Sequence, residues 1–344
     1  MMELNESQQN IVQTDKSHVV IVAAAASGKT NTLTARLQYL LNMNVDPESI
    51  VVITFTRLAA DVLYERVGQI PGLFIGTIHG YANFLLSRAG ISTRKTLDDE
   101  EFDVLFDMVK ENPQCVRPVE YLLLDESQDS NELHFNFILN VIRPAHYMFM
   151  GDHRQSIYRF NGARPDILLD LMEDPDVTTF HLNQNYRNGY KILNYAKRII
   201  QRNGTDYYDD SVAMKSTSGR TIETPYSPKS LCHLILENPQ FGKWFVLTRT
   251  NAQLDNFARA LTLNQIPFDT FKQSQLNKAA LNAKMKEDTV KLLTIHSAKG
   301  LENYRVIVIG ANFYNLEERC ISYVAATRAR DILIWTTNAK PKYF

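Results

Sequence analysis

The residues with the clearest chemical potential lie between Val19 and Thr30. Four β-branched residues, Val19 to Val22, precede four alanines and then Ser27-Gly28-Lys29-Thr30. This order predicts a buried strand, a tight turn and a helix that begins near Lys29. The backbone N–H groups of such a turn and the helix N-terminus bind phosphate, the lysine reaches the terminal phosphates, and the threonine hydroxyl binds Mg²⁺.

The turn departs from the full phosphate-loop pattern, because Ala23 stands where that pattern has glycine. Small side chains still let the backbone approach an anion, but Ala24 and Ala26 adopt positive φ less readily than glycine does. A strand-to-helix turn that carries Gly-Lys-Thr by chance is the alternative interpretation of this stretch taken alone.

A pair of carboxylates, Asp125 and Glu126, directly follows the apolar run 121–124. A strand that ends in adjacent carboxylates is what a phosphate-loop ATPase requires. Asp125 would bind Mg²⁺, and Glu126 would orient and deprotonate the attacking water. A solvated acidic turn is the alternative.

The elements that must position these residues alternate between strand and helix. Apolar runs predict strands at 19–22, 50–53, 73–75, 121–124 and 147–150, and the segments between them favour helices. This alternation is typical of a parallel α/β sheet. Polar residues follow several of these strands, at the edge where open α/β sheets bind ligands, although each could be an ordinary loop residue. They are Thr54, Thr56, Arg57, Thr77 and His79.

Composition and length describe a globular protein of two domains. The chain has 344 residues, of which 44% are hydrophobic and 22% charged. We expect no membrane partner and a cytoplasmic location, because no apolar run is long enough to span a bilayer and the N-terminus lacks the pattern of a signal peptide. The three cysteines are far apart and form no CxxC pair, so we expect free thiols.

Charge is unevenly distributed along the chain. Residues 1–180 carry 14 Lys and Arg against 25 Asp and Glu, a net charge of −11, whereas residues 181–344 carry 23 against 13, a net charge of +10. This asymmetry favours two domains that face each other across a cleft, with the basic one able to bind phosphate-bearing ligands. The alternative is that the solvent-exposed surfaces of the two halves simply differ in their numbers of charged residues.

A series of longer motifs resembles the UvrD/Rep/PcrA-type superfamily 1A DNA helicases. In the first half these are AAAASGKT, ITFTRLAADVLYERV, GTIHG, LLLDESQD and GDHRQSIYRFNGA; the second half continues with LNQNYRN, FVLTRTNAQLDNFARAL, LLTIHSAKGLEN and EERCISYVAATRARD. The resemblance spans nearly the whole chain. It implies two RecA-like α/β domains, with parallel sheets flanked by helices and ATP in the cleft between them. We expect them at 1–180, with a small helical insert at about 82–118, and at 181–344.

The resemblance also implies roles for individual residues toward ATP and Mg²⁺. Lys29, Thr30 and Asp125 would hold phosphate and Mg²⁺, together with the loop residues Ala26, Ser27 and Gly28. Glu126 would be the catalytic base, Gln155 the γ-phosphate sensor, and Arg187 and Arg328 the arginine fingers. The remaining nucleotide contacts would come from Gln8, Tyr186, Gly300 and Glu302.

Single-stranded DNA, or its junction with duplex, is the partner that the resemblance implies. The residues expected to touch it are Thr54, Phe55, Arg57, Thr77, His79, Tyr158, Phe160 and His296. Aromatic rings stack on bases without regard to sequence, which suits a motor. Core packing is the alternative for each aromatic residue, and for Phe55 the two interpretations are equally favoured.

Several positions depart from the family pattern. Asn31 follows Gly-Lys-Thr where relatives usually have arginine, and Phe160 stands where they often have tryptophan. The segment between Phe268 and Val290 is short but basic, with Lys272, Lys278, Lys284 and Lys286, and only Lys340 to Phe344 follow the last expected strand. We therefore expect an ATP-driven 3′ to 5′ helicase or translocase, which could need an accessory protein to unwind duplex. A nucleotide-dependent DNA-binding module is the third possibility.

Overall fold

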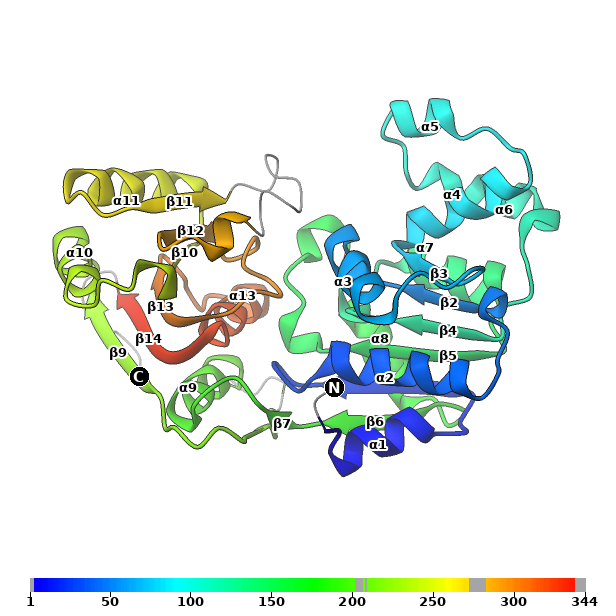
Figure 1. Ribbon diagram of the computed structural model, residues 1–344, viewed down its shortest axis with the longest axis horizontal. Helices are drawn as coiled ribbons and strands as arrows, with labels where there is room; N and C mark the ends of the chain where they lie inside the picture. The colour runs from blue at the N-terminus through cyan, green and yellow to red at the C-terminus, as the bar shows by residue number, and fades with distance from the viewer. Residues whose placement is uncertain (1–2, 202–206, 208, 272–282, 338–344) are drawn as a thin grey trace. The chain divides into compact units, whose positions relative to one another are not determined.

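The computed structural model describes residues 3–201, 207, 209–271 and 283–337. The chain divides into two compact units, Met1–Leu182 and Asn183–Phe344 (Figure 1). Lys272, Lys278 and the segment 340–344 lie outside the described residues. Among the residues that are described, every helix is too short or too polar to cross a membrane.

The first unit is a six-stranded parallel sheet in the order β3-β2-β4-β5-β1-β6. Its strands are β1 (His18–Ala23), β2 (Ile50–Ile53), β3 (Phe74–Gly76), β4 (Tyr121–Leu124), β5 (His146–Gly151) and β6 (Thr178–Leu182). Its α-helices are α1 (Glu6–Gln13), α2 (Lys29–Asn42), α3 (Arg57–Val67), α4 (Ile78–Arg88), α5 (Arg94–Asp98), α6 (Val104–Glu111), α7 (Glu132–Asn136) and α8 (Pro165–Glu173).

Short helical turns complete the first unit. The 3₁₀ turns are η1 (Pro47–Ser49), η2 (Pro113–Cys115), η3 (Ser127–Asp129), η5 (His153–Gln155) and η6 (Arg159–Asn161), and η4 (Phe137–Ile142) is a π-helix that extends α7. Residues 82–118, where an insert is predicted, overlap the helical region from α4 to η2, and α5 stands apart from the sheet in Figure 1.

Both faces of this sheet are covered by helices. Apolar residues of α1, α2 and α3 pack on one face, and those of α4, α6, α7, η4 and α8 pack on the other. Because both faces are buried, β1, β2, β4 and β5 are nearly continuous apolar runs, as is typical of parallel sheets, whereas the edge strand β6 carries Thr178, Thr179 and His181. All five predicted strands are confirmed within one or two residues.

The second unit is also a six-stranded parallel sheet, in the order β11-β12-β10-β13-β14-β9. Its strands are β9 (Arg220–Pro225), β10 (Trp244–Thr248), β11 (Phe268–Phe271), β12 (Val290–Thr294), β13 (Asn303–Ile309) and β14 (Ala329–Thr337), and a separate pair is formed by β7 (Gln184–Asn185) and β8 (Val212–Ala213). Its helices are α9 (Tyr190–Ile200), α10 (Pro228–Leu236), η7 (Phe241–Lys243), α11 (Asn251–Leu263) and α13 (Leu316–Ala326).

Helices α10 and α11 pack on this second sheet through one apolar cluster, and α9 and α13 pack against each other and the sheet. The predicted fold class, two α/β units with parallel sheets flanked by helices, is therefore confirmed. All three cysteines are free thiols, as expected, and all three are buried.

Polar residues at the strand ends begin the helices that follow. Thr56 accepts a hydrogen bond from Ala59 N–H at the start of α3, and Thr77 accepts one from Gly80 N–H at the start of α4. Asn5 and Gln8 form a capping box at the start of α1. Side-chain oxygens at these positions satisfy the unpaired N–H groups of a first helical turn.

Candidate functional site: nucleotide and nucleic-acid residues

The turn between β1 and α2 has the shape of a phosphate loop. Gly28 has φ +86° at the N-cap of α2, which begins at Lys29 as predicted. Ala26 has φ +58°, so an alanine adopts the left-handed conformation that glycine would adopt more cheaply. The buried Ser27 Oγ has no hydrogen-bond partner among the described residues. A buried hydroxyl without a partner is costly, and a bound anion would supply one. The loop therefore fits a nucleotide phosphate.

Gln8 connects α1 to this loop. Its amide nitrogen donates to the Ser27 carbonyl at 3.1 Å, and its amide oxygen accepts from Asn5 N–H at 3.0 Å. The side chain is buried, and a Cβ added to Gly28 would lie 2.7 Å from its Nε2. In this structure Gln8 therefore holds the phosphate loop through its bond to Ser27, and its contact with adenine stays a prediction.

The loop lysine and the candidate base lie close together. Lys29 Nζ is 4.0 Å from Glu126 Oε1, and both side chains are largely shielded from solvent. Asp125 is buried at the end of β4, where its Oδ1 accepts from Glu126 N–H at 2.9 Å. The carboxyl ends of two strands thus place a cation and two carboxylates where phosphate and Mg²⁺ would meet.

Gln128 is a site residue that our sequence analysis missed. Its Nε2 donates to Glu126 Oε2 at 2.5 Å, and its Oε1 accepts from Asp152 N–H at 2.9 Å. Asp152 in turn accepts from Gln155 Nε2 at 2.7 Å. The candidate base is therefore linked through Gln128 and Asp152 to the predicted γ-phosphate sensor. The run LLLDESQD contained Gln128, but only the fold shows what it contacts.

Asp152 is a fully buried carboxylate with cationic neighbours. Burial alone would raise its pKa, but the charges of Arg154, Lys29 and His153 outweigh burial and hold the pKa below its usual value. Arg154 Nε donates to Asp152 Oδ1 at 2.6 Å. Asp152 is therefore ionised, and it couples the lysine of the phosphate loop to the turn that carries Gln155.

Arg187 and Glu302, two predicted nucleotide residues of the second unit, pair with each other. Arg187 Nε donates to Glu302 Oε2, and its NH1 donates to the Thr327 carbonyl at 3.2 Å. Burial alone would raise the pKa of Glu302, but the charge of Arg187, followed by those of Arg330 and Arg328, holds it below its usual value. The guanidinium predicted to act as a finger is held by a carboxylate in this state.

Arg328, the other predicted finger, is buried in the second unit. Its guanidinium donates to the Val324 carbonyl at 2.9 Å, the Leu301 carbonyl at 3.3 Å and Thr327 Oγ1 at 3.0 Å. These bonds tie the end of α13 to the segment before β13. A structural role for Arg328 is therefore visible, and its catalytic role stays a prediction.

The other predicted nucleotide and DNA residues of the second unit lie in loops. Tyr186 is 45% exposed, and its hydroxyl donates to Gln184 Oε1 at 2.5 Å, so its predicted stacking on adenine stays a prediction. His296 and Gly300 lie in the turns between β12 and β13, where Gly300 has φ +81°.

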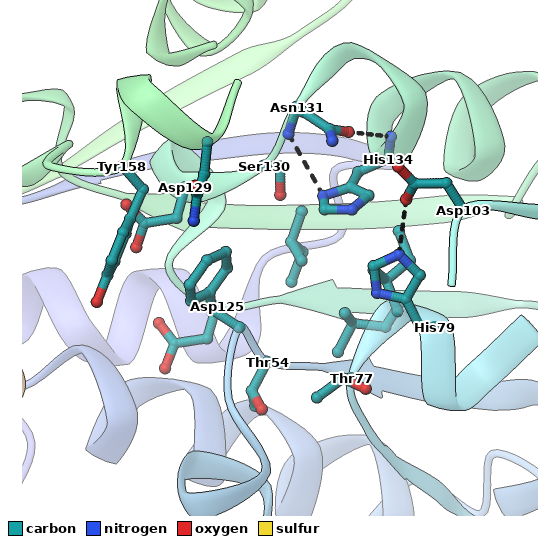
Figure 2. A pocket seen from close by; sticks show the side chains of 15 residues that line it. Thr54, Thr77, His79, Asp103, Asp125, Asp129, Ser130, Asn131, His134 and Tyr158 are labelled. Atoms are coloured by element: carbon teal, nitrogen blue, oxygen red, sulfur yellow. Dashed lines mark hydrogen bonds and ion pairs between the residues drawn. The ribbon is translucent and has the colours of Figure 1, made fainter. Parts of the chain in front are cut away.

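Five of the eight predicted DNA residues line one cavity of the first unit. The cavity has a volume of about 330 Å³ and lies at the carboxyl ends of β2 and β4 (Figure 2). The five residues are Thr54, Phe55, Thr77, His79 and Tyr158. Phe55 is half-buried and stacks on Tyr158 with ring centroids 5.2 Å apart, so it belongs to the cavity wall. Arg57 and Phe160 are exposed outside this cavity.

The cavity also has an acidic and an imidazole component. Asp103, Asp125 and Asp129 line it, together with His134. Burial, together with the charge of His79, lowers the pKa of His134 to about 4 despite the opposing charge of Asp103, so the ring is neutral at neutral pH. Burial, and then the charges of Asp129 and Glu126, raise the pKa of Tyr158 to about 12. This wall suits bases better than phosphates.

Comparison with known proteins finds two helicase domains in this chain. Residues 4–112 and 105–176 match the UvrD/REP helicase N-terminal domain, and residues 270–340 match the UvrD-like helicase C-terminal domain. The chain is 25% identical to a probable DNA helicase II homolog of Mycoplasma capricolum, over 77% of this chain and 51% of the relative. It is 24% identical to the ATP-dependent DNA helicase Rep of Escherichia coli, over 78% of this chain and 55% of the relative.

In a third relative, the match covers a larger share of the relative's own length. The chain is 24% identical to a probable DNA helicase of Mycoplasma pneumoniae, over 97% of this chain and 83% of the relative. By contrast, it spans about half the length of the Mycoplasma capricolum and Escherichia coli proteins. With both family domains matched in order, the chain belongs to the UvrD/Rep helicase family.

Proposed function

We propose that this chain hydrolyses ATP in response to single-stranded DNA and uses the energy to move 3′ to 5′ along that strand and unwind duplex. The observation that carries the proposal is the approach of Lys29 Nζ to within 4.0 Å of Glu126 Oε1, beside the buried Asp125. A phosphate-binding lysine next to two carboxylates is the arrangement that metal-assisted attack of water on a phosphoryl group requires.

ATP and Mg²⁺ fit the residues around the phosphate loop. Ser27 Oγ and the backbone N–H groups near Gly28 would bind the phosphates, and Thr30 and Asp125 would hold Mg²⁺, which neutralises the developing charge. Glu126 would accept a proton from water as the oxygen attacks the γ-phosphorus and the bond to the β–γ bridging oxygen breaks. ADP and phosphate are the products.

Residues of the second unit would complete the reaction. Charge builds on the transferring phosphoryl group, and the guanidinium groups of Arg187 and Arg328 would stabilise it. Arg187 would first have to leave Glu302, whose carboxylate would then be available to the ribose. Hydrolysis would thus be coupled to closure of the two units, and this coupling would drive strand movement.

The cavity of the first unit would accept bases of the DNA strand. Phe55 and Tyr158 provide aromatic surface, and stacking contributes about 1–3 kcal/mol per base without sequence preference. The carboxylates of Asp103 and Asp129 on the wall would repel phosphates, so the backbone would run outside the cavity. Arg57 and Phe160 are exposed and could contact the strand there.

The test combines an ATPase assay with strand displacement, each with and without single-stranded DNA. We expect hydrolysis to rise when the DNA is added, and a duplex with a 3′ tail to be displaced in preference to one with a 5′ tail. ATP-dependent DNA binding without hydrolysis would instead identify a binding module. Equal activity on both tails would contradict the polarity.

A further inference from the structure

Three side chains from separate segments of the first unit form a compact cluster beside the cavity (Figure 2). They are His79 of α4, Asp103 at the N-cap of α6 and His134 of α7. One ligand atom from each lies within 4.8 Å of the others. His79 Nε2 is 2.9 Å from Asp103 Oδ1, and the two imidazole rings meet edge to face with centroids 5.2 Å apart.

His134 contributes an unsatisfied buried nitrogen. The residue is only 9% exposed, and its Nδ1 lies 3.3 Å from the Asn131 N–H, which donates to it. Its Nε2 has no hydrogen-bond partner among the described residues. Because buried polar atoms are almost always paired, this nitrogen is expected to have a partner that the described residues do not supply.

We propose that His79, Asp103 and His134 bind a first-row divalent transition-metal ion of the Zn²⁺ class. Two imidazoles and one carboxylate are ligands that Zn²⁺ and its neighbours prefer, whereas Mg²⁺ prefers oxygen ligands throughout. The fourth position would face the cavity and hold water. None of the three side chains is a predicted nucleotide residue, although Asp125 lines the same cavity and His79 is a predicted DNA residue; the metal site does not depend on the proposed function.

The shortest distance in the cluster is close to that of a metal site, and the other ligand atoms lie within 4.8 Å and would move inward on binding. Bonds of about 2.0–2.1 Å place two ligand atoms of a tetrahedral ion roughly 3.3 Å apart, so the 2.9 Å pair must open slightly. The Asp103 side chain is 56% exposed and can move by that amount. When the ion binds His134 Nε2, the proton of the neutral ring must move to Nδ1. Nδ1 can then no longer accept the 3.3 Å hydrogen bond from Asn131 N–H, and the loss of this bond lowers the affinity of the site.

A bound ion would join three elements that are far apart in the sequence. It would fix the segment before α6, and with it the helical region α4 to α6, to α7 on the cavity wall. Binding to the folded state alone raises the stability of that state. Zn²⁺ should therefore raise the melting temperature of the protein as well as bind measurably.

The test uses the untagged full chain, treated with chelator and then dialysed, without nucleotide or DNA. Zn²⁺ is titrated in a calorimeter and in thermal melts, and Co²⁺ is used as a spectroscopic probe of coordination. We expect one ion per chain and a rise in melting temperature. Asp103→Asn and His134→Ala should each weaken binding at least tenfold. His233→Ala is the matched control, because His233 Nδ1 also lies 3.2 Å from a carboxylate, Glu237, but belongs to no three-ligand cluster among the described residues.

The proposal would be overturned by a lack of Zn²⁺ binding, by binding that Asp103→Asn leaves intact, or by binding that His233→Ala weakens as much as Asp103→Asn does. Asp103→Asn decides the matter even when His134→Ala fails to fold, because Asp103 is exposed and the amide keeps its shape. A Co²⁺ spectrum typical of six oxygen ligands would also contradict coordination by two imidazoles.

Discussion

Glu126 has a backbone conformation that is unusual for a residue other than glycine. Its φ of 52° and ψ of 39° lie in the left-handed region, which costs about 1–2 kcal/mol for a residue other than glycine. Hydrogen bonds on both sides hold it there, from its own N–H to Asp125 and from Gln128 to its carboxylate. Strain of this kind persists where the surroundings determine the conformation, and it often marks functional sites.

Replacing Glu126 tests its role as the base. Glu126→Gln should leave ATP binding nearly intact and reduce DNA-stimulated turnover to below a few per cent, because the amide cannot accept the proton from water. Steady-state hydrolysis and equilibrium nucleotide binding are the measurements. Glu132→Gln is the control, since Glu132 is a well-exposed carboxylate in the same unit. Substantial turnover in Glu126→Gln would assign the base elsewhere.

Ala26 offers a prediction about stability. Ala26→Gly should stabilise the first unit by about 0.5–1 kcal/mol, because relief of the left-handed strain exceeds the entropy cost of glycine. Ala24→Gly is the matched control, since Ala24 is not among the residues with positive φ, and it should destabilise by a similar amount. Urea denaturation of both variants measures this difference. A lower stability for Ala26→Gly would show that the loop is not strained in solution.

At the scale of elements, the close approach of β5 to η3 shapes the edge of the sheet that carries the candidate site. A Cβ added to Gly151, the last residue of β5, would lie 2.6 Å from Ser127 Oγ and 2.7 Å from Gln128 Oε1. Only glycine allows this approach without a shift of the turn. The close contact places Asp152 N–H within hydrogen-bond distance of Gln128, which links the two segments.

The turn η6 presents Phe160 to solvent, with 65% of the residue exposed. Phe160→Ala should weaken single-strand binding by about 1–3 kcal/mol, through lost stacking, with an unchanged melting temperature. Fluorescence anisotropy with a labelled oligonucleotide and a thermal melt are the measurements. Leu133→Ala is the control, because it removes a comparably exposed apolar side chain, 50% exposed on α7, and should not change binding. A melting temperature lowered without loss of binding would identify Phe160 as a packing residue.

At the scale of the whole molecule, the two halves differ in net charge, −11 for residues 1–180 and +10 for residues 181–344. Basic residues bind phosphates with release of counterions, so DNA binding by this chain should weaken steeply with salt. Buried Lys291 contributes to the fold instead, because its Nζ donates to the Glu287 carbonyl at 3.0 Å and pairs with Asp269.

Motor activity and duplex unwinding should separate in this protein. We expect DNA-stimulated hydrolysis by the chain alone, but poor displacement of a long duplex until a partner protein is added. Opening duplex costs about 1.4 kcal/mol per base-pair step and needs a grip on the duplex ahead, for which the segment 272–289 between β11 and β12 is short. Strand displacement from a 3′-tailed duplex is the measurement. Processive unwinding without a partner would contradict this expectation.

The sequence by itself determined the fold class, the positions of five strands in the first unit and the phosphate loop. These features depend on neighbouring residues: an apolar run long enough for a buried strand, a small-residue turn and Gly-Lys-Thr at a helix start. The carboxylates Asp125 and Glu126 were predictable for the same reason, because they directly follow β4.

Only the tertiary structure decided how residues from distant segments pair. Gln128 meets Asp152, Arg187 meets Glu302, and His79 meets Asp103 and His134. It also decided that Arg328 is buried and that its guanidinium donates hydrogen bonds to backbone carbonyls. Hydrogen bonding and burial depend on which remote segments pack together in the fold. The local sequence around a residue does not indicate which remote residue will contact it.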